Sequence, residues 1–318
     1  MITLEFIYVL MGLLLAGITA VNARDRTNPK RWRNTAFWGI YAATFLFGSY
    51  LPPLASGVLV LAMTAVAGFG GLGQGAPDTT SADERVAHAK RLGNRLYVPA
   101  LLVPGVALLG TLTLKQAAFH GTPLVDPRQV TVISLGIATL VALAAALAIL
   151  RPAALTPVRE ARRLMDTVGW AAVLPQMLAA LGALFALAGV GKVVSAAVTR
   201  WLPLNGPLGA VIAYAVGMAL FTMLMGNAFA AFPVMAAGIG LPLIVHRFGG
   251  DAAVVSAIGM LAGFCGTLMT PMAANFNIVP VALLELPDEK AVIRVQVPTA
   301  LVLLAINTAL IYFLAFRG

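Results

Sequence analysis

Residues 129–150 read QVTVISLGIATLVALAAALAIL, a run of 22 positions without a charged side chain. About 20 mostly apolar residues are enough for a helix to cross the hydrocarbon core of a bilayer. The whole chain has the same character, because 60% of its residues are hydrophobic and only 10% are charged, against about 45–50% and about 25% in soluble domains. We therefore exclude a soluble enzyme, a nucleic-acid-binding protein and a disordered chain, and predict an all-α polytopic membrane protein.

Similar apolar segments recur on both sides of this run. They predict about eight full transmembrane spans, at 3–22, 35–51, 54–73, 96–114, 129–150, 169–191, 251–284 and 298–316. A further apolar stretch, 207–247, predicts a re-entrant helical hairpin, and 251–284 predicts one broken helix. Residues 20–23 resemble a signal-peptide cleavage site, but the basic residues follow the first apolar run instead of preceding it, which favours a span.

The distribution of basic residues predicts the orientation. Fifteen of the 21 lysines and arginines fall in four alternate loops, at 24–33, 85–95, 151–163 and 290–294. The positive-inside rule places these loops in the cytoplasm and the N-terminus outside, in what we expect to be the inner membrane of a bacterium. The formal net charge of +9 then reflects loops that face membrane lipid, and nucleic acid is not expected as a partner.

A short basic segment divides the chain. Residues 157–168 combine arginines with apolar side chains, and Pro157 suits the first turn of a helix. They predict a helix in the cytoplasmic interface, with an ordinary basic loop as the alternative. We expect three regions: scaffold-like helices at 1–150, the interfacial helix and a linking span at 151–206, and a transport-like region at 207–318.

The predicted hairpin at 207–247 is interrupted at its middle. The stretch carries no charge before Arg247, yet it contains Gly226-Asn227 and Pro233. Non-helical backbone at membrane depth is tolerated only where it is buried in protein or lines a wet cavity. A tip at the membrane surface would normally carry charge, so we predict a re-entrant hairpin whose tip, 226–233, lies inside the membrane. Two full spans joined by a tight turn are the alternative.

The predicted broken helix at 251–284 holds a denser group of polar residues. Its break combines hydroxyls and amides with glycine and proline, at Gly266, Thr267, Thr270, Pro271, Asn275 and Asn277. Secondary transporters build substrate sites from discontinuous helices near the bilayer midplane. Helix N-termini there offer N–H groups to anions, and freed carbonyl groups can coordinate sodium. We therefore take these residues, together with Asn227, as the candidate binding site.

Carboxylates are missing from the centres of the predicted spans. Glu5, Asp166, Asp251 and Glu285 all lie near span ends. A proton-driven carrier usually needs a buried titratable group, so their placement favours sodium as the coupling ion, or a carboxylate supplied by another subunit. The single Cys265 and three scattered histidines predict no metal site, and no catalytic or cofactor motif is present. We expect neither enzymatic activity nor a cofactor.

Three runs resemble domain-of-unknown-function family 979: DTVGWAAVLPQMLAALG at 166–182, MGNAFAAFPVM at 225–235 and CGTLMTPMAANFNIVP at 265–280. The pattern is also similar to the ion transporter superfamily of elevator-type carriers. In that superfamily, hairpin tips bearing Ser-Asn-Thr and broken helices bearing Gly-Thr-Pro-Pro-Asn form the substrate and sodium sites. The resemblance implies binding roles at the tip and at the break, for Gly226, Asn227, Ala228, Gly266, Thr267, Thr270, Pro271 and Asn275.

Departures from that pattern concern the sodium ligands and the number of repeats. Gly226 and Ala228 replace the serine and threonine, and Leu-Met separates Thr267 from Thr270. The superfamily has two inverted repeats, whereas this chain shows one hairpin and one broken helix. Members of family 979 resemble one half of a two-gene system, which implies a second membrane subunit of family 969. A second copy of this chain is the other candidate.

These observations lead to two functional hypotheses. The first is a subunit of an elevator-type secondary transporter, coupled to sodium, for a small organic anion. The gene neighbours typical of the family that this chain resembles suggest 5-oxoproline or a related carboxylate as the substrate. The second is a non-transporting membrane scaffold or regulatory subunit.

Overall fold

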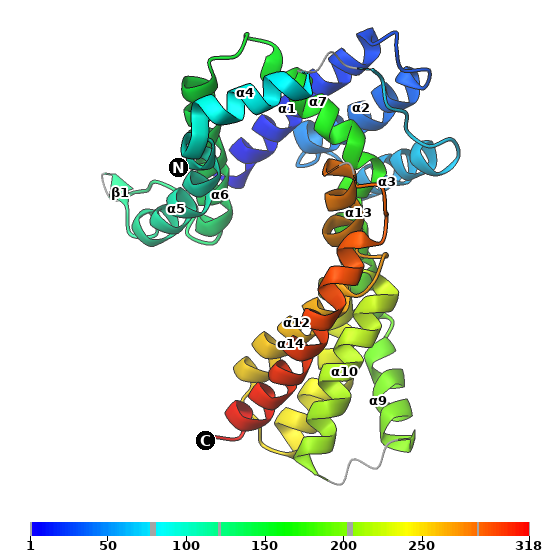
Figure 1. Cartoon of the computed structure of the whole chain (residues 1–318). Coiled ribbons are helices and arrows are strands. Elements are labelled where there is room, and N and C mark those ends of the chain that lie inside the picture. Colours follow the sequence, from blue (N-terminus) through cyan, green and yellow to red (C-terminus); the bar gives the residue numbers. More distant parts are fainter. Residues whose placement is uncertain (1, 77–80, 120–121, 202–205, 285, 318) are drawn as a thin grey trace. The chain divides into compact units, whose positions relative to one another are not determined.

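The computed structural model describes residues 2–76, 81–119, 122–201, 206–284 and 286–317 (Figure 1). The described residues are almost entirely helical, and their only sheet is a hairpin of two short antiparallel strands, β1 (Ala118–Phe119) and β2 (Thr122–Pro123). Within these described ranges, seven helices are long and apolar enough to cross a membrane. The prediction of an all-α polytopic membrane protein is therefore confirmed.

The predicted spans and the observed helices differ most where the helices are short. α2 (Arg31–Phe47), α3 (Pro53–Gly68) and α12 (Ala252–Leu268) have 17, 16 and 17 residues. The predicted span 54–73 ends early, at Gly68, because the glycine-rich loop that follows turns back onto α2. There the carbonyl oxygen of Gly70 accepts hydrogen bonds from two basic side chains, those of Lys30 and Arg33.

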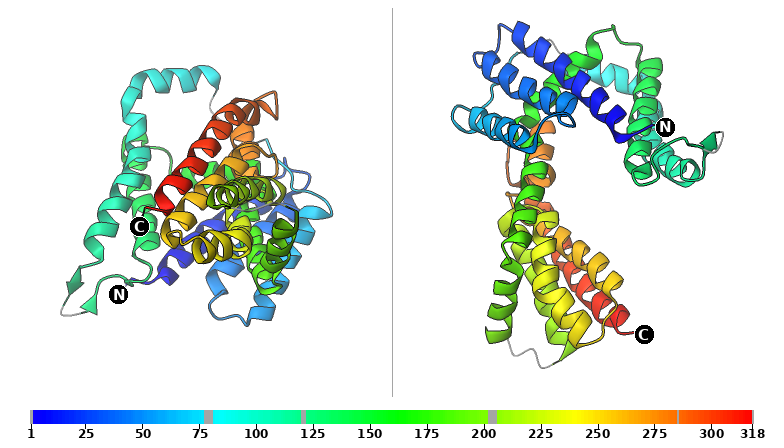
Figure 2. Two further views of the ribbon diagram at one scale, coloured as in Figure 1. Left: turned by 90° about the horizontal axis from the view of Figure 1, so that it is seen from below. Right: turned by 180° about the vertical axis from the view of Figure 1, so that it is seen from behind.

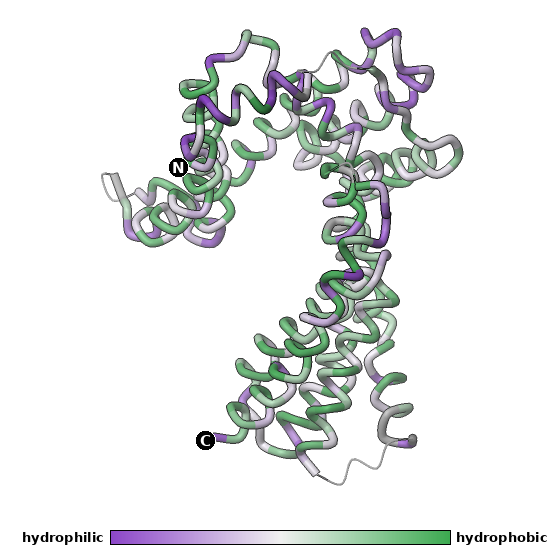
Figure 3. Tube along the Cα trace, viewed as in Figure 1, coloured by the Kyte–Doolittle hydropathy of each residue, from purple (hydrophilic) through white to green (hydrophobic). Residues whose placement is uncertain are grey.

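The chain forms two compact units, Met1–Asp166 and Thr167–Gly318. In the first unit, α1 (Leu4–Arg24) packs against α2, and α5 (Tyr97–Leu114) packs against α6 (Val130–Leu150). α4 (Ala82–Leu92) leads into α5 through the short 3₁₀ turn η1 (Gly93–Leu96). Figure 3 shows hydrophilic residues gathered along α4 and at the turn between α1 and α2, whereas α5 and α6 are mostly hydrophobic.

The predicted helix at 157–168 is present as α7 (Thr156–Val168), with Pro157 in its first turn. One face of α7 is buried: Arg162 and Asp166, one turn apart, are each 6% exposed. Val158, another turn earlier, lies against Gly17 of α1. A helix with this pattern packs onto its own unit through a charged face, and its place in the membrane interface stays a prediction.

The second unit contains the predicted hairpin and the predicted broken helix. Its helical segments in chain order are η2 (Gly169–Ala172), α8 (Leu174–Leu187), α9 (Val190–Trp201), α10 (Pro207–Met225), α11 (Ala228–Met235), η3 (Ala236–Arg247), α12, α13 (Ala274–Leu283) and α14 (Ala291–Ala315). α10, α12 and α14 pack side by side, as the views in Figures 1 and 2 agree. Tyr214 of α10 is fully buried in the core of this bundle, against Gly259 of α12, where any larger residue would collide with the ring.

The hairpin has two long arms. α10 forms the first, and α11 with the π-helical segment η3 forms the second, with 19 and 20 residues respectively. At about 1.5 Å per residue the α-helical first arm measures about 28 Å, close to the thickness of the hydrocarbon core. The helical hairpin is therefore present, with arms long enough for two full spans, and the depth of its tip in the membrane stays a prediction.

Candidate functional site

The hairpin tip is a two-residue turn between α10 and α11. Gly226 has a left-handed φ of +73° and its N–H donates to the carbonyl of Thr222 over 2.7 Å. Asn227 is extended, and its side-chain oxygen caps α11 by accepting from the N–H of Phe229 at 2.7 Å. Glycine suits the first position because a positive φ strains other residues, and asparagine is a favoured N-cap. The sequence Gly-Asn thus ends one helix and starts the next.

The predicted break in the second segment is also present. α12 ends at Leu268, residues 269–273 are not helical, and α13 begins at Ala274. The side-chain amide of Asn277 bridges the gap, because its nitrogen donates to the carbonyls of Thr267 at 2.9 Å and Thr270 at 2.6 Å. A side chain thereby replaces two of the hydrogen bonds that the interrupted helix has lost.

The break begins later than predicted. We expected it between Gly266 and Pro271, but Gly266 and Thr267 lie in the last turn of α12. Gly266 instead allows α12 to pack closely against α10, because a side chain at this position would collide with the carbonyl of Ala219. The hydroxyl of Thr267 donates back to the carbonyl of Phe264 at 2.6 Å, within its own helix.

The tip and the break touch one another. The hydroxyl of Thr270 donates to the carbonyl of Met223, in the last turn of α10, at 2.9 Å and accepts from the N–H of Met272 at 3.2 Å. Gly226 lies so close to the carbonyl of Met272 that a Cβ at the tip would collide with it. One hydroxyl and one backbone contact therefore join two interruptions that are 47 residues apart in sequence.

A small pocket of about 20 Å³ lies at this junction. Its lining comes from α8, the tip and the start of α13: Leu174, Leu178, Gly226, Asn227, Met272, Ala273, Ala274 and Phe276. Asn227 is the one polar side chain in this lining, and none of the lining side chains is charged. Asn227 is the N-cap of α11, and Ala274 and Phe276 lie in the first turn of α13, so two helix N-termini with their partial positive charge lie beside the pocket. The chemistry suits a small anionic or polar group.

Eight of the nine predicted site residues fall into three groups, and the side chain of the ninth, Asn275, lies outside the described part of the chain. Gly226 and Asn227 line the pocket. The second group is buried and holds the two breaks together or packs beneath them: Ala228, Gly266, Thr267, Thr270 and Asn277. Pro271 is exposed in the turn. The backbone of Asn275 lies in the first turn of α13.

Leu174 and Leu178 of α8 belong to the site but were not predicted. Gln176, the polar residue between them, is exposed and does not line the pocket. Leucines in an apolar helix give no sequence signal of a binding role. Thr222 was also missed: it is fully buried, its hydroxyl has no hydrogen-bond partner among the described residues, and its carbonyl ends α10.

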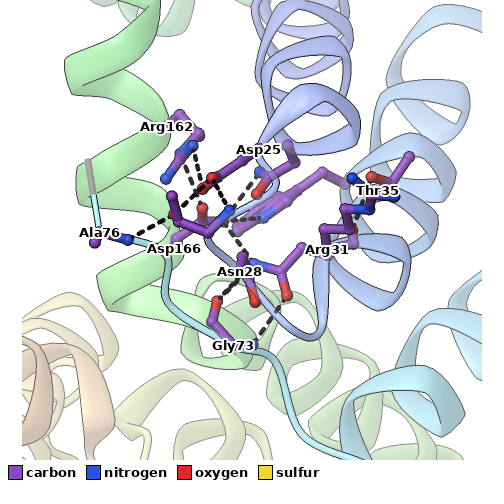
Figure 4. A network of polar contacts seen from close by, with 12 residues as sticks. Asp25, Asn28, Arg31, Thr35, Gly73, Ala76, Arg162 and Asp166 are labelled. Carbon is purple, nitrogen blue, oxygen red and sulfur yellow. Dashed lines mark hydrogen bonds and ion pairs between the residues drawn. The ribbon is translucent and has the colours of Figure 1, made fainter. Parts of the chain in front are cut away.

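A second polar site lies in the first unit. Figure 4 shows the polar network in which Asp25, Arg162 and Asp166 lie close together. We call the residues joined to Asp166 and Arg162 the Asp166 cluster, which comprises Asn22, Asp25, Asn34, Trp38, Arg162 and Asp166. Oδ1 of Asp166 accepts from the Asn22 amide at 3.2 Å, from the Asn34 amide at 3.1 Å and from the Trp38 indole at 2.8 Å. Arg162 pairs with Asp25 at 2.8 Å and with Asp166 at 3.3 Å.

The Asp166 cluster could not be predicted from spacing. Asn22 and Asn34 lie 144 and 132 residues from Asp166 in sequence, and each is unremarkable alone. Asp166 lies two residues before the end of α7, and its place near the end of a membrane span stays a prediction. Its burial among amide, indole and guanidinium donors is a finding of the structure.

Comparison with known proteins gives one result. No curated protein and no solved structure matches the chain. A family model described as "Protein of unknown function (DUF979)" matches residues 5–316, which covers both compact units. The predicted resemblance to family 979 is thus confirmed, whereas the similarity to the ion transporter superfamily stays a prediction. The chain belongs to the DUF979 family.

Proposed function

We propose that this protein is a subunit of a secondary active transporter for a small organic anion, working with a second membrane subunit. The observation that carries the proposal is the contact between the hairpin tip and the helix break, through Thr270 and Met223 and through Gly226 and Met272. Discontinuous helices that meet in this way are how secondary carriers build a substrate site. Asn227 and two helix N-termini give the site neutral donors suited to a carboxylate.

The small size of the pocket is the reason to propose a second subunit. A pocket of about 20 Å³ holds little more than one water molecule, so a whole carboxylate such as 5-oxoproline needs further walls or a rearrangement. We propose that a second membrane subunit, of family 969 or alternatively a second copy of this chain, supplies the missing part. Two compact units suit an elevator-type carrier with one moving and one fixed part, and the uncharged site suits sodium as the coupling ion.

The same pocket supports a second candidate function. A site with so little space is also what a non-transporting scaffold or regulatory subunit would show, because such a subunit binds no substrate of its own. The two candidates differ in whether the chemistry of Asn227 affects substrate affinity.

Asn227→Asp tests the proposed site. Aspartate is as good an N-cap as asparagine, so α11 should still form, but the new carboxylate would face the bound anion. Like charges about 4 Å apart repel by at least about 1 kcal/mol. We expect the apparent affinity for 5-oxoproline to fall about fivefold or more, measured as uptake of radiolabelled substrate by cells that also express the family 969 neighbour.

The matched control makes the same chemical change outside the pocket. Gln176→Glu also turns an amide into a carboxylate, on an exposed position of α8, and should leave the affinity near that of the parent once the amounts of membrane-inserted protein are equalised. Parent-like uptake by the Asn227→Asp variant would contradict the proposed site and favour the scaffold function.

A further inference from the structure

The Asp166 cluster holds more negative than positive charge. Two carboxylates, those of Asp25 and Asp166, share the single guanidinium of Arg162, and these three side chains are at most 9% exposed. Buried charges are normally paired one to one, because an uncompensated charge in a low-dielectric interior is costly. The three side chains leave one negative charge in excess.

The neighbouring basic residues do not pair with this charge. Lys30, in the turn before α2, and Arg33, in the first turn of α2, each donate to the carbonyl of Gly70 at 2.8 Å. Arg24 and Arg26, near the end of α1, are exposed. The groups from α1 and α2 that contact Asp166 are neutral donors, two amides and one indole. Hydrogen bonds from neutral groups, and no second cation among the described residues, therefore stabilise the excess negative charge.

Three buried oxygen atoms in the cluster have no hydrogen-bond donor among the described residues: Oδ2 of Asp166, Oδ2 of Asp25 and Oδ1 of Asn22. The two carboxylate oxygens contact Arg162 only as ion pairs without hydrogen-bond geometry, Asp25 at 2.8 Å and Asp166 at 3.3 Å. Asn22 is fully buried, and its amide already contacts the carboxyl of Asp166. A buried acceptor without a donor is costly. A proton on Oδ2 of Asp166 would remove the excess negative charge of the cluster.

Asp25 is not the carboxylate that takes this proton. Burial raises the pKa of Asp25, but hydrogen bonds from the backbone and hydroxyl of Thr27 and the charge of Arg162 outweigh it, so the pKa lies below its ordinary value. Thr27 donates to Oδ1 of Asp25 at 2.8 Å and 2.6 Å. Asp25 therefore stays ionised and neutralises Arg162.

We infer that Asp166 is a proton-binding site of this protein. One proton from solvent adds to Oδ2 of Asp166, the Arg162–Asp25 pair remains, and the cluster changes from a net charge of −1 to zero. This site lies in the first compact unit and is distinct from the pocket at the hairpin tip. The inference goes beyond the proposed transport function and does not depend on it.

Trp38 provides a built-in reporter. Its indole N–H donates to Asp166 at 2.8 Å, so its resonance depends on the charge of that carboxyl. The full chain, labelled with ¹⁵N-tryptophan, would be titrated by NMR over the range of about pH 5 to 8 in which folded proteins are generally most stable. Trp38→Phe assigns the signal. We expect the Trp38 indole resonance to move through a single one-proton transition.

Three variants decide the result. Asp166→Asn should abolish the transition. Asp25→Asn should move it to lower pH, because a like charge is removed and Arg162 then serves Asp166 alone. Asp83→Asn, an exposed carboxylate of α4, should leave it unchanged. A Trp38 resonance that does not titrate, or a transition that persists in Asp166→Asn, overturns the inference. If Asp166→Asn fails to fold, an Asp25→Asn shift to higher pH or no shift overturns it equally.

Discussion

Replacing Arg162 by methionine should lower the free energy of unfolding by about 3–5 kcal/mol, the range measured when one partner of a buried ion pair is removed. Methionine keeps much of the side-chain volume, so the effect comes from charge. Asp25 and Asp166 would lose the only guanidinium that pairs with both of them. Thermal unfolding of the purified protein in detergent, followed at neutral pH, measures the loss.

The control for this variant lies on the same helix. Arg159→Met removes an exposed arginine of α7 and should change the free energy of unfolding by less than about 0.5 kcal/mol. Adding Asp166→Asn to the Arg162→Met background should recover part of the loss, because one orphaned carboxylate is removed. At lower pH the difference in free energy of unfolding between Arg162→Met and the parent should become smaller, because the carboxylates that have lost Arg162 then become protonated. Equal unfolding of Arg162→Met and Arg159→Met would show that the buried pairs do not stabilise the first unit.

Gly226→Ala should destabilise the second unit and abolish substrate uptake. The added Cβ meets two obstacles, the left-handed backbone of the tip and the carbonyl of Met272 in the helix break. Backbone strain of this kind costs about 1–3 kcal/mol, and the collision adds to it because a backbone carbonyl cannot turn aside like a flexible side chain. Melting temperature and uptake would be measured on the same variant.

Gly249→Ala separates the two causes. Gly249 has a φ of +74°, almost equal to that of Gly226, but a Cβ there would meet nothing within 4 Å. Gly249→Ala should therefore lower the free energy of unfolding only by the strain of a left-handed backbone, roughly 1–2 kcal/mol. If Gly226→Ala is no worse than Gly249→Ala, the tip does not press against the break and the joined site is wrong.

The sequence predicted the membrane class and the positions of both interruptions well, because each depends on local composition. The run 129–150 could only be a buried or membrane helix, and Gly226-Asn227 has the chemistry of a helix end followed by a helix start. The break near Thr270 was predicted three residues early, since Gly266 was read as a helix breaker. In the structure that glycine permits close packing against Ala219, and no sequence pattern separates these two uses.

Contacts between distant segments could not be predicted. The bond from Thr270 to the last turn of α10 and the convergence of Asn22, Asn34 and Trp38 on Asp166 depend on tertiary packing. An asparagine in a membrane helix usually makes a bond to a neighbouring helix, and the sequence does not say which one. The same limit applied to Leu174 and Leu178, whose role comes only from their position beside the tip.

In the function that we propose, the joined tip and break form part of a substrate site that a second membrane subunit completes. The direct measurement is accumulation of radiolabelled 5-oxoproline by proteoliposomes under an inward sodium gradient, with this chain alone, its family 969 neighbour alone, or both together. We predict accumulation only when both subunits are present, and its loss when potassium replaces sodium. Full accumulation by liposomes that contain this chain alone would contradict the claim.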